Sequence, residues 1–253
     1  MNTAEYERMY RLEDSYWWFV GRHRLIESLL RSYYGPPDNP ESTLRLLDIG
    51  CGTGAMSARL ARWGKVVSAD FSPLALQFSR RRGLHNLVGA DAMNLPFQGD
   101  QFDALVAMDM LEHLPDDNAA LREFNRVLKP GGRVFATVPA YMHLWSDHDV
   151  SLMHHRRYVR AEMAERFATA GFEIEKLSHT MMLLYPVVAM QRRLNRTKST
   201  LPQFAAPVNA ALTSLFTAEN AMAKHLNFPF GVTILCIARK KSEVRSQKSE
   251  AGV

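Results

Sequence analysis

The sequence predicts an α/β fold in which a parallel sheet is covered by helices on both faces. Three observations indicate this class: runs of strand length alternate with helical stretches, these runs are apolar throughout, and a glycine-rich turn follows the first of them. The 253 residues are 47% hydrophobic and 23% charged, values typical of a globular protein, which excludes a disordered or collagen-like chain.

An N-terminal helical cap or lid, residues 1–40, precedes the sheet. Apolar and aromatic residues recur at helical spacing over residues 5–34, which predicts two short helices, and a Gly-Pro-Pro run at 35–37 ends the second. The four consecutive aromatic residues at 16–19 cannot all enter one core from a helix. Two interpretations stay open: Trp17 and Trp18 contact a ligand, or these rings staple the cap onto the sheet.

Strands and helices alternate through the expected core, residues 41–178. The predicted strands are Arg45–Ile49, Lys65–Asp70, Asn86–Gly89, Phe102–Met108, Gly132–Val138 and Phe172–Ser178. The predicted helices are Ala55–Trp63, Pro73–Arg82, Asn118–Val127 and Arg160–Ala170. A helical insertion is expected at 179–230, a last strand at Val232–Ala238 within 231–241, and a disordered tail at 242–253.

A glycine-rich turn, LLDIGCGTG at 46–54, joins the first strand to the next helix. Glycine has no Cβ, so the backbone at Gly50, Gly52 and Gly54 can approach a ligand closely, and free N–H groups of the helix face its polar end. The pattern also fits a dinucleotide-binding turn, and Asp70, 20 residues after Gly50, suits a ribose diol in both cases. The turn therefore predicts a cofactor that contains a nucleoside, but it does not show whether that cofactor is a dinucleotide.

Two carboxylates favour a cofactor that carries an ammonium group and adenine. Asp48 precedes the glycines, where it suits an ammonium group and would repel a pyrophosphate. Asp91 follows the third strand, where it could accept a hydrogen bond from the adenine amino group. Together with SADFS at 68–72, GADAMNLPF at 89–97, FDALVAMDMLEHL at 102–114 and VLKPGG at 127–132, the chain resembles class I S-adenosylmethionine-dependent methyltransferases of the type 11 small-molecule branch.

The resemblance implies a Rossmann-like, seven-stranded sheet of order 3-2-1-4-5-7-6 with the last strand antiparallel. It also implies S-adenosyl-L-methionine as cofactor and S-adenosyl-L-homocysteine as product. Asp48 and Gly50 would hold the methionine part, Asp70 the ribose, Asp91 and Ala92 the adenine, with Asp109 near the transferring methyl group. The full implied set is Asp48, Gly50, Gly52, Gly54, Asp70, Phe71, Asp91, Ala92, Met93 and Asp109.

Histidines are the candidate catalytic groups on the acceptor side. Methyl transfer from a sulfonium is an in-line displacement and needs a base only when the acceptor loses a proton. We expect His148 or His154 to act as that base, and His113 is a third candidate, which the resemblance also explains as packing beside the cofactor. The predicted substrate contacts are Trp17, Trp18, Tyr141, Arg156, Arg157 and Tyr158, although the two arginines could instead brace a lid. No metal site is predicted.

The predicted function is methyl transfer to an oxygen or nitrogen of a small or medium-sized, partly apolar metabolite. A lipid-like, cell-envelope or secondary-metabolite precursor is among the candidate substrates. Alternatives are an RNA (tRNA) methyltransferase, which the net charge of +5 favours, and a non-catalytic nucleotide-cofactor-binding protein. Nucleic acid is disfavoured because much of the excess positive charge lies in the tail.

The apolar stripes of the helical insertion have three readings: core packing, an apolar substrate pocket, or a peripheral membrane contact. The chain's 2 cysteines, Cys51 and Cys236, form no disulfide framework, which is typical of a cytoplasmic protein. The sequence makes no prediction of the oligomeric state.

Overall fold

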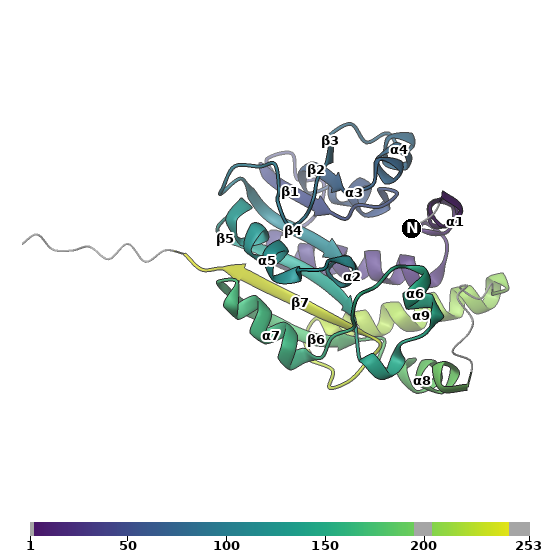
Figure 1. Cartoon of the computed structure of the whole chain (residues 1–253). Helices are drawn as coiled ribbons and strands as arrows, with labels where there is room; N and C mark the ends of the chain where they lie inside the picture. The colour runs from purple at the N-terminus through teal and green to yellow at the C-terminus, as the bar shows by residue number, and fades with distance from the viewer. Residues whose placement is uncertain (1–2, 195–203, 243–253) are drawn as a thin grey trace, which may run out of the picture.

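A mixed sheet forms the centre of the computed structural model, which describes residues 3–194 and 204–242 (Figure 1). Its strands are β1 (Leu44–Ile49), β2 (Gly64–Asp70), β3 (Leu87–Gly89), β4 (Phe102–Met108), β5 (Leu128–Pro139), β6 (Phe172–Thr180) and β7 (Thr233–Lys240). They lie in the order β3-β2-β1-β4-β5-β7-β6. The first five strands pair in parallel, and β7 runs antiparallel to both β5 and β6. The predicted sheet order and the antiparallel last strand are confirmed.

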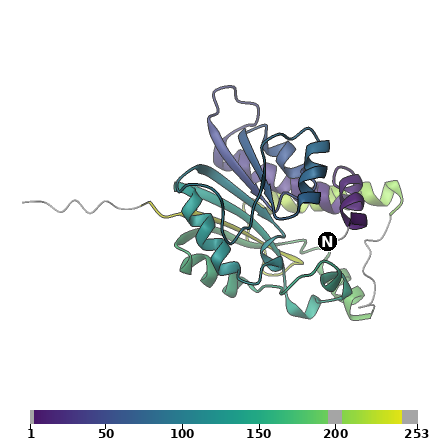
Figure 2. The same ribbon diagram turned by 45° about the horizontal axis from the view of Figure 1, so that its top comes forward.

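Helices cover both faces of this sheet (Figures 1 and 2). They are α1 (Thr3–Leu12), α2 (Trp17–Tyr34), α3 (Ala55–Leu60), α4 (Pro73–Arg81), α5 (Asp117–Val127), α6 (Asp147–Ser151), α7 (Arg160–Thr169), α8 (Tyr185–Leu194) and α9 (Ala206–Ala223), with short 3-10 turns η1 (Leu111–His113) and η2 (Met142–Leu144). Buried residues of α2 and α3 share one core with the sheet, and those of α5 and α7 share the other.

The alternation of side chains along β4 explains why this strand is apolar throughout. Leu105 and Ala107 enter the core beneath α5 and α7, whereas Ala104 and Val106 enter the core beneath α2 and α3. Successive side chains of a strand point to opposite faces, and here both faces are covered. The arrangement brings the carboxyl ends of β1, β2, β3 and β4 to one edge of the sheet, and the predicted cofactor residues follow these ends.

Several predicted boundaries were wrong. The second helix of the cap, α2, is 18 residues long rather than short, and it ends at Tyr34, where Gly35 takes φ +80° and donates to the Arg31 carbonyl at 3.1 Å. The helix after the glycine turn ends at Leu60, not at Trp63, whose indole Nε1 donates to the Gly35 carbonyl at 3.0 Å. Trp63 therefore makes this tertiary contact instead of continuing the helix.

Two helices, α8 and α9, lie between β6 and β7 in the described part of the insertion. α9 packs along α2, with the Trp17 and Phe216 rings edge to face at 6.1 Å. Trp17 donates its backbone N–H to Asn209 Oδ1 at 2.9 Å. The aromatic residues of the cap therefore staple it to α9 rather than to the sheet itself.

Within the described ranges, no helix is long and apolar enough to cross a membrane. Of the predicted disordered tail, residues 243–253 lie outside the described part of the chain, as does the stretch 195–203 of the insertion.

Candidate functional site

The glycine turn between β1 and α3 has the backbone that its sequence requires. Gly50, Gly52 and Gly54 have φ values of +71°, +56° and +87°, in the left-handed region that favours glycine. A Cβ atom at Gly52 would lie 2.7 Å from Cε of Met9, and one at Gly50 would lie 2.5 Å from Cγ of Met110. The turn is thus approached closely by α1 and by the segment after β4.

Asp48 and Asp70 flank this turn from two neighbouring strands. Asp48 is buried and accepts a hydrogen bond of 2.5 Å from the Ser57 hydroxyl, and burial raises its pKa to about 7. Asp70 accepts from the Gly52 N–H at 2.9 Å and the Ser72 N–H at 2.8 Å, and burial raises its pKa as well. Asp70 therefore connects the end of β2 directly to the glycine turn.

The predicted adenine-side residues lie after β2 and β3. Asp91 accepts a hydrogen bond from the Met93 N–H at 2.9 Å, which closes a tight turn, and Ala92 is buried beneath it. Phe71 is 80% exposed, unusually high for a phenylalanine beside a core strand. An exposed ring next to Asp70 offers a flat surface to a nucleoside base.

Glu13 was missed by the sequence analysis. It lies between α1 and α2, is buried, accepts a hydrogen bond from the Thr53 hydroxyl, and forms an ion pair of 3.0 Å with Arg82. Arg82 also donates to the Thr53 carbonyl at 2.8 Å. Burial is the largest influence on Glu13 and raises its pKa to about 6. The N-terminal cap is therefore tied to the glycine turn, a long-range contact that no local pattern in the sequence indicates.

Asp109, predicted near the methyl group, is held by two other elements. Its carboxylate forms an ion pair of 2.7 Å with Arg22 of α2 and accepts from the Thr137 hydroxyl of β5 at 3.0 Å. Asp109 has φ +47°, a backbone conformation that a side chain disfavours. Trp18 stacks on the Arg22 guanidinium, whose carbon lies 4.2 Å from the ring centroid.

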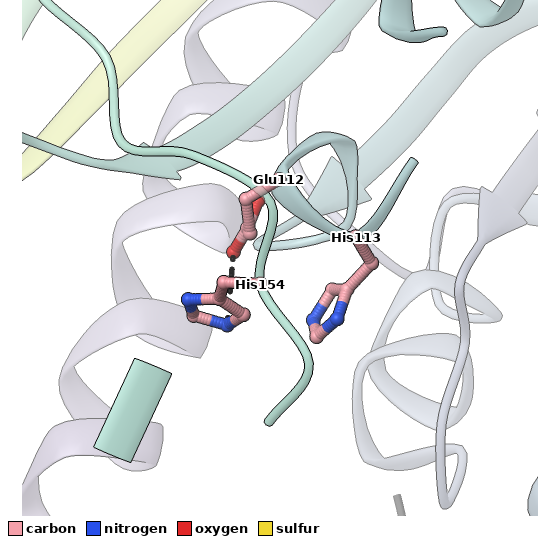
Figure 3. A group of neighbouring side chains, drawn as sticks. All are labelled: Glu112, His113 and His154. Atoms are coloured by element: carbon pink, nitrogen blue, oxygen red, sulfur yellow. Dashed lines mark ion pairs between the residues drawn. The ribbon is translucent and has the colours of Figure 1, made fainter. Parts of the chain in front are cut away.

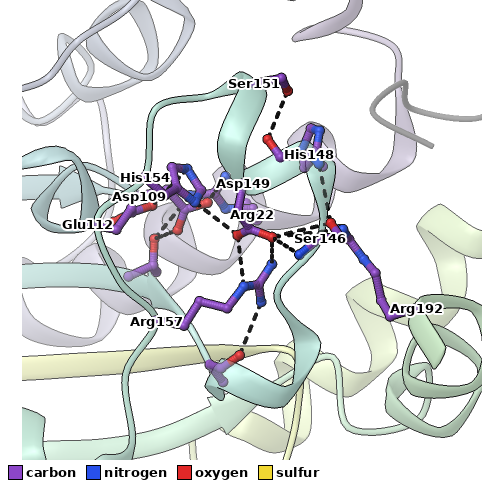
Figure 4. Close-up of polar contacts among 12 residues, drawn as sticks. Arg22, Asp109, Glu112, Ser146, His148, Asp149, Ser151, His154, Arg157 and Arg192 are labelled. Carbon is purple, nitrogen blue, oxygen red and sulfur yellow. Dashed lines mark hydrogen bonds and ion pairs between the residues drawn. The ribbon is translucent and has the colours of Figure 1, made fainter. Parts of the chain in front are cut away.

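Two of the three predicted catalytic histidines come together. His113 follows β4 and His154 lies in the loop after α6, and their rings are edge to face with centroids 4.6 Å apart (Figure 3). Glu112 joins them: one of its carboxylate oxygens lies 4.0 Å from His154 Nε2. His148 lies on α6, outside this group (Figure 4).

Asp149 organises the loop that carries His154 (Figure 4). It is fully buried, lies 3.0 Å from His154 Nδ1, and receives two hydrogen bonds from Arg157, of 2.8 and 3.1 Å. Ser146 donates to the same carboxylate and closes a capping box at the start of α6. The hydrogen bonds from His154 and Arg157 outweigh burial and lower the pKa of Asp149.

Most of the remaining predicted substrate contacts are bonded to other residues of the protein. Arg157 also donates to the Ala140 carbonyl at 3.1 Å, and Arg156 pairs with Asp117 at 3.1 Å, so both arginines brace the loop. Tyr158 is fully buried and donates to Asp117 at 2.7 Å. We therefore leave Tyr158 out of the proposed substrate contacts.

Tyr141 lies beside a hollow near α8. It stacks on His143, with ring centroids 5.0 Å apart, and His143 and Tyr185 are 2.9 Å apart between Nε2 and the hydroxyl oxygen. A cavity of about 470 Å³ is lined by His143, Tyr185, Ala189, Met190 and Arg193. None of these residues belongs to the glycine turn, so the hollow lies on the side of the insertion rather than of the cofactor.

A glycine turn and three carboxylates, at the carboxyl ends of neighbouring strands in a sheet of this order, define the class I S-adenosylmethionine-dependent methyltransferase fold. Residues 47–136 match the family described as a methyltransferase domain. This match to a methyltransferase domain agrees with the sequence motifs, and it lies within a sheet that has the strand order of the class I methyltransferase fold.

Curated relatives are similar over different lengths. A demethylmenaquinone methyltransferase of Staphylococcus saprophyticus is 40% identical over 104 residues, which cover 38% of this chain and 45% of the relative. A ubiquinone biosynthesis O-methyltransferase of Xanthomonas axonopodis pv. citri is 29% identical over 219 residues, which cover 78% of this chain and 91% of the relative. The chain spans about half of the length of the first of these relatives.

Solved structures show the same fold. One is a putative methyltransferase from Haloferax volcanii, in complex with the Trm112 methyltransferase activator. It is 19% identical to this chain, with a TM-score of 0.61, and the alignment covers 94% of this chain and 95% of the other. At this identity the likeness bears on the fold alone.

Proposed function

We propose that the protein transfers a methyl group from S-adenosylmethionine to an acceptor atom of a small or medium-sized, partly apolar metabolite. The observation that carries the proposal is that Asp48, Asp70 and Asp91 lie at or just after the carboxyl ends of three neighbouring strands, with Asp70 hydrogen-bonded to the glycine turn. Ligands of open α/β sheets bind outside the carboxyl ends of the strands. The transfer is an in-line displacement, so the protein's main contribution is to align the acceptor, the methyl group and the sulfur.

We propose one orientation of the cofactor against these side chains. Asp48 faces the ammonium group, Asp70 takes the ribose hydroxyls, and Phe71 covers the adenine, whose amino group meets Asp91. Asp109 then lies on the methionine side. The match to the methyltransferase-domain family supports S-adenosylmethionine as the donor.

We propose an oxygen acceptor in preference to nitrogen. The support for oxygen is that the Xanthomonas relative is named as an O-methyltransferase of ubiquinone biosynthesis. The hollow beside α8 has apolar walls at Ala189 and Met190, which suits a partly apolar substrate. A hydroxyl acceptor must lose its proton during transfer. We assign the acceptor side to the group of Glu112, His113 and His154, because these residues follow Asp109 or lie against the segment that does.

Calorimetry of the full chain with S-adenosylhomocysteine and with NAD tests the proposal. We expect micromolar binding of S-adenosylhomocysteine and none of NAD; the reverse result contradicts the proposal. Turnover is then measured with a radiolabelled methyl donor and panels of hydroxylated aromatic compounds, amines and bulk tRNA. Labelling of a small molecule supports the proposal, whereas salt-sensitive labelling of tRNA alone would support the RNA alternative. Binding with no labelling of any acceptor would favour the non-catalytic alternative.

A further inference from the structure

A carboxylate and two imidazoles converge from two distant segments of the chain. Glu112 and His113 belong to η1, directly after β4, and His154 belongs to the loop after α6 (Figure 3). One potential ligand atom from each residue lies within 4.8 Å of the others. The sequence pattern did not indicate this group, because 40 residues lie between His113 and His154.

Glu112 is the member that calls for an explanation. Its side chain is fully buried, and neither carboxylate oxygen has a hydrogen-bond partner within the described part of the chain. The Asp109 carboxylate lies nearby, and neither Arg22 nor Arg157 donates a hydrogen bond to Glu112. A buried, unpaired carboxyl group is costly unless a cation or proton compensates it.

We propose that Glu112, His113 and His154 bind a divalent transition-metal ion of the zinc type. One carboxylate oxygen and two imidazole nitrogens are a common donor set for such ions, and three protein ligands leave a coordination position open. Metal–ligand bonds of about 2.1 Å at tetrahedral angles place ligand atoms roughly 3.4 Å apart. The 4.0 Å between Glu112 and His154, and separations of up to 4.8 Å within the group, must therefore shorten by about 0.6 to 1.4 Å as the side chains close on the ion.

Neighbouring groups orient both imidazoles for metal binding. Asp149 lies 3.0 Å from His154 Nδ1, so a proton on that nitrogen leaves Nε2 free to face Glu112. His113 is hydrogen-bonded to the Leu152 backbone, which fixes the orientation of its ring. A carboxylate or carbonyl behind each ligating histidine is the usual second layer of a metal site.

The position gives the ion a role in the proposed reaction. The proposed ion would join the turn after β4 to the loop that carries His154. Its ligand Glu112 lies three residues after Asp109, and its open coordination position can hold an acceptor oxygen. This role rests on the proposed function, whereas the binding of the ion does not.

Cobalt(II) is the probe for the site, because its visible absorption reports the coordination geometry. The full chain is stripped with a chelator, then titrated with Co²⁺ alone and with Zn²⁺ in competition. We expect one Co²⁺ per chain, an intense absorption band of a four- or five-coordinate ion, and its loss on adding Zn²⁺. Glu112→Gln and His154→Gln should weaken binding at least 100-fold, and Asp149→Asn about 10- to 100-fold. His155→Gln, a neighbouring exposed histidine, is the matched control and should bind as the wild type does.

Thermal unfolding with and without Zn²⁺ checks that each variant is folded, and Zn²⁺ should stabilise only the variants that bind it. The proposal is overturned if the wild type shows no saturable Co²⁺ band, or if His154→Gln binds as tightly as His155→Gln. S-adenosylhomocysteine affinity is measured on the same samples: a normal metal titration with no S-adenosylhomocysteine binding would reject the proposed function but keep the metal site.

Discussion

Arg22 and Asp109 form an ion pair of 2.7 Å that joins the N-terminal cap to the end of β4. Their side chains are 8% and 20% exposed, and the Arg22 guanidinium also donates to Thr137 at 3.0 Å. Through this pair, α2 holds the carboxylate that we place beside the methionine part of the cofactor. The cap is thus a structural component of the site and not an appendage.

Removing Arg22 should destabilise the fold. Arg22→Ala leaves Asp109 largely buried without its cation, and breaking such a pair from one side costs roughly 3 kcal/mol. Urea unfolding followed by circular dichroism measures the change. Arg24→Ala, on the same helix with an exposed hydrogen bond to Thr217, is the control and should cost less than about 1 kcal/mol. Equal losses in both variants would contradict a special role of the pair.

Cofactor affinity should rise with pH around neutrality. Burial raises the pKa of Asp48 to about 7 in the free protein, and we expect the cofactor's ammonium group to bind its ionised form. Below pH 7, Asp48 must first lose a proton, so affinity falls by up to about tenfold per pH unit. Calorimetry with S-adenosylhomocysteine at pH 6, 7 and 8 measures this dependence. Asp48→Asn should bind weakly with a flat profile; a flat profile in the wild type would argue against ionisation of Asp48 on binding.

Glu13 should make stability depend on pH in the acidic range. Its pKa is about 6 in the folded chain against 4.5 as the reference value. A raised pKa means that its contribution is fully present below pH 4.5 and is lost as the pH rises through about 6. The change amounts to roughly 2 kcal/mol. Unfolding free energies of the wild type and Glu13→Gln from pH 4 to 7 check this, because the variant should lose this part of the pH dependence. Parallel curves would contradict it.

Gly21 marks the contact between α2 and α9. A Cβ atom at Gly21 would lie 2.1 Å from Cδ1 of Phe216, far closer than packing allows. Gly21→Ala should therefore destabilise the fold by about 1 to 3 kcal/mol, although alanine favours a helix. Phe216→Leu in the same chain should relieve part of that cost, so the two changes should be non-additive in a double-mutant cycle. Additive losses would show that the Phe216 ring does not determine the cost of Gly21→Ala.

The fold was more predictable from the sequence than the site. Strands such as Phe102–Met108 are apolar on both faces, so their existence and parallel pairing follow from local pattern, and the motifs placed them in order. Helix ends depend on tertiary contacts, which is why the helix predicted to reach Trp63 ends at Leu60. The base roles of His148 and His154 stay predictions.

Long-range contacts account for what sequence reasoning missed at the site. Glu13 reaches Thr53, and Glu112 reaches His154, across 40 or more residues, so no spacing rule links the partners. The buried Tyr158 likewise donates a hydrogen bond to Asp117 of α5, which lies 41 positions earlier in the chain. Such long-range contacts are recognised only from the three-dimensional positions of the loops.

The affinity of S-adenosylhomocysteine for Asp70→Asn, compared with Asp38→Asn, is the most direct measurement of the central claim. Asp70 joins β2 to the glycine turn, whereas Asp38 precedes β1, before the opposite edge of the sheet. Loss of charged hydrogen bonds to the ribose should weaken binding by Asp70→Asn about 10- to 100-fold, and Asp38→Asn should bind as the wild type does. Wild-type affinity in both variants would contradict the placement of the cofactor at this turn.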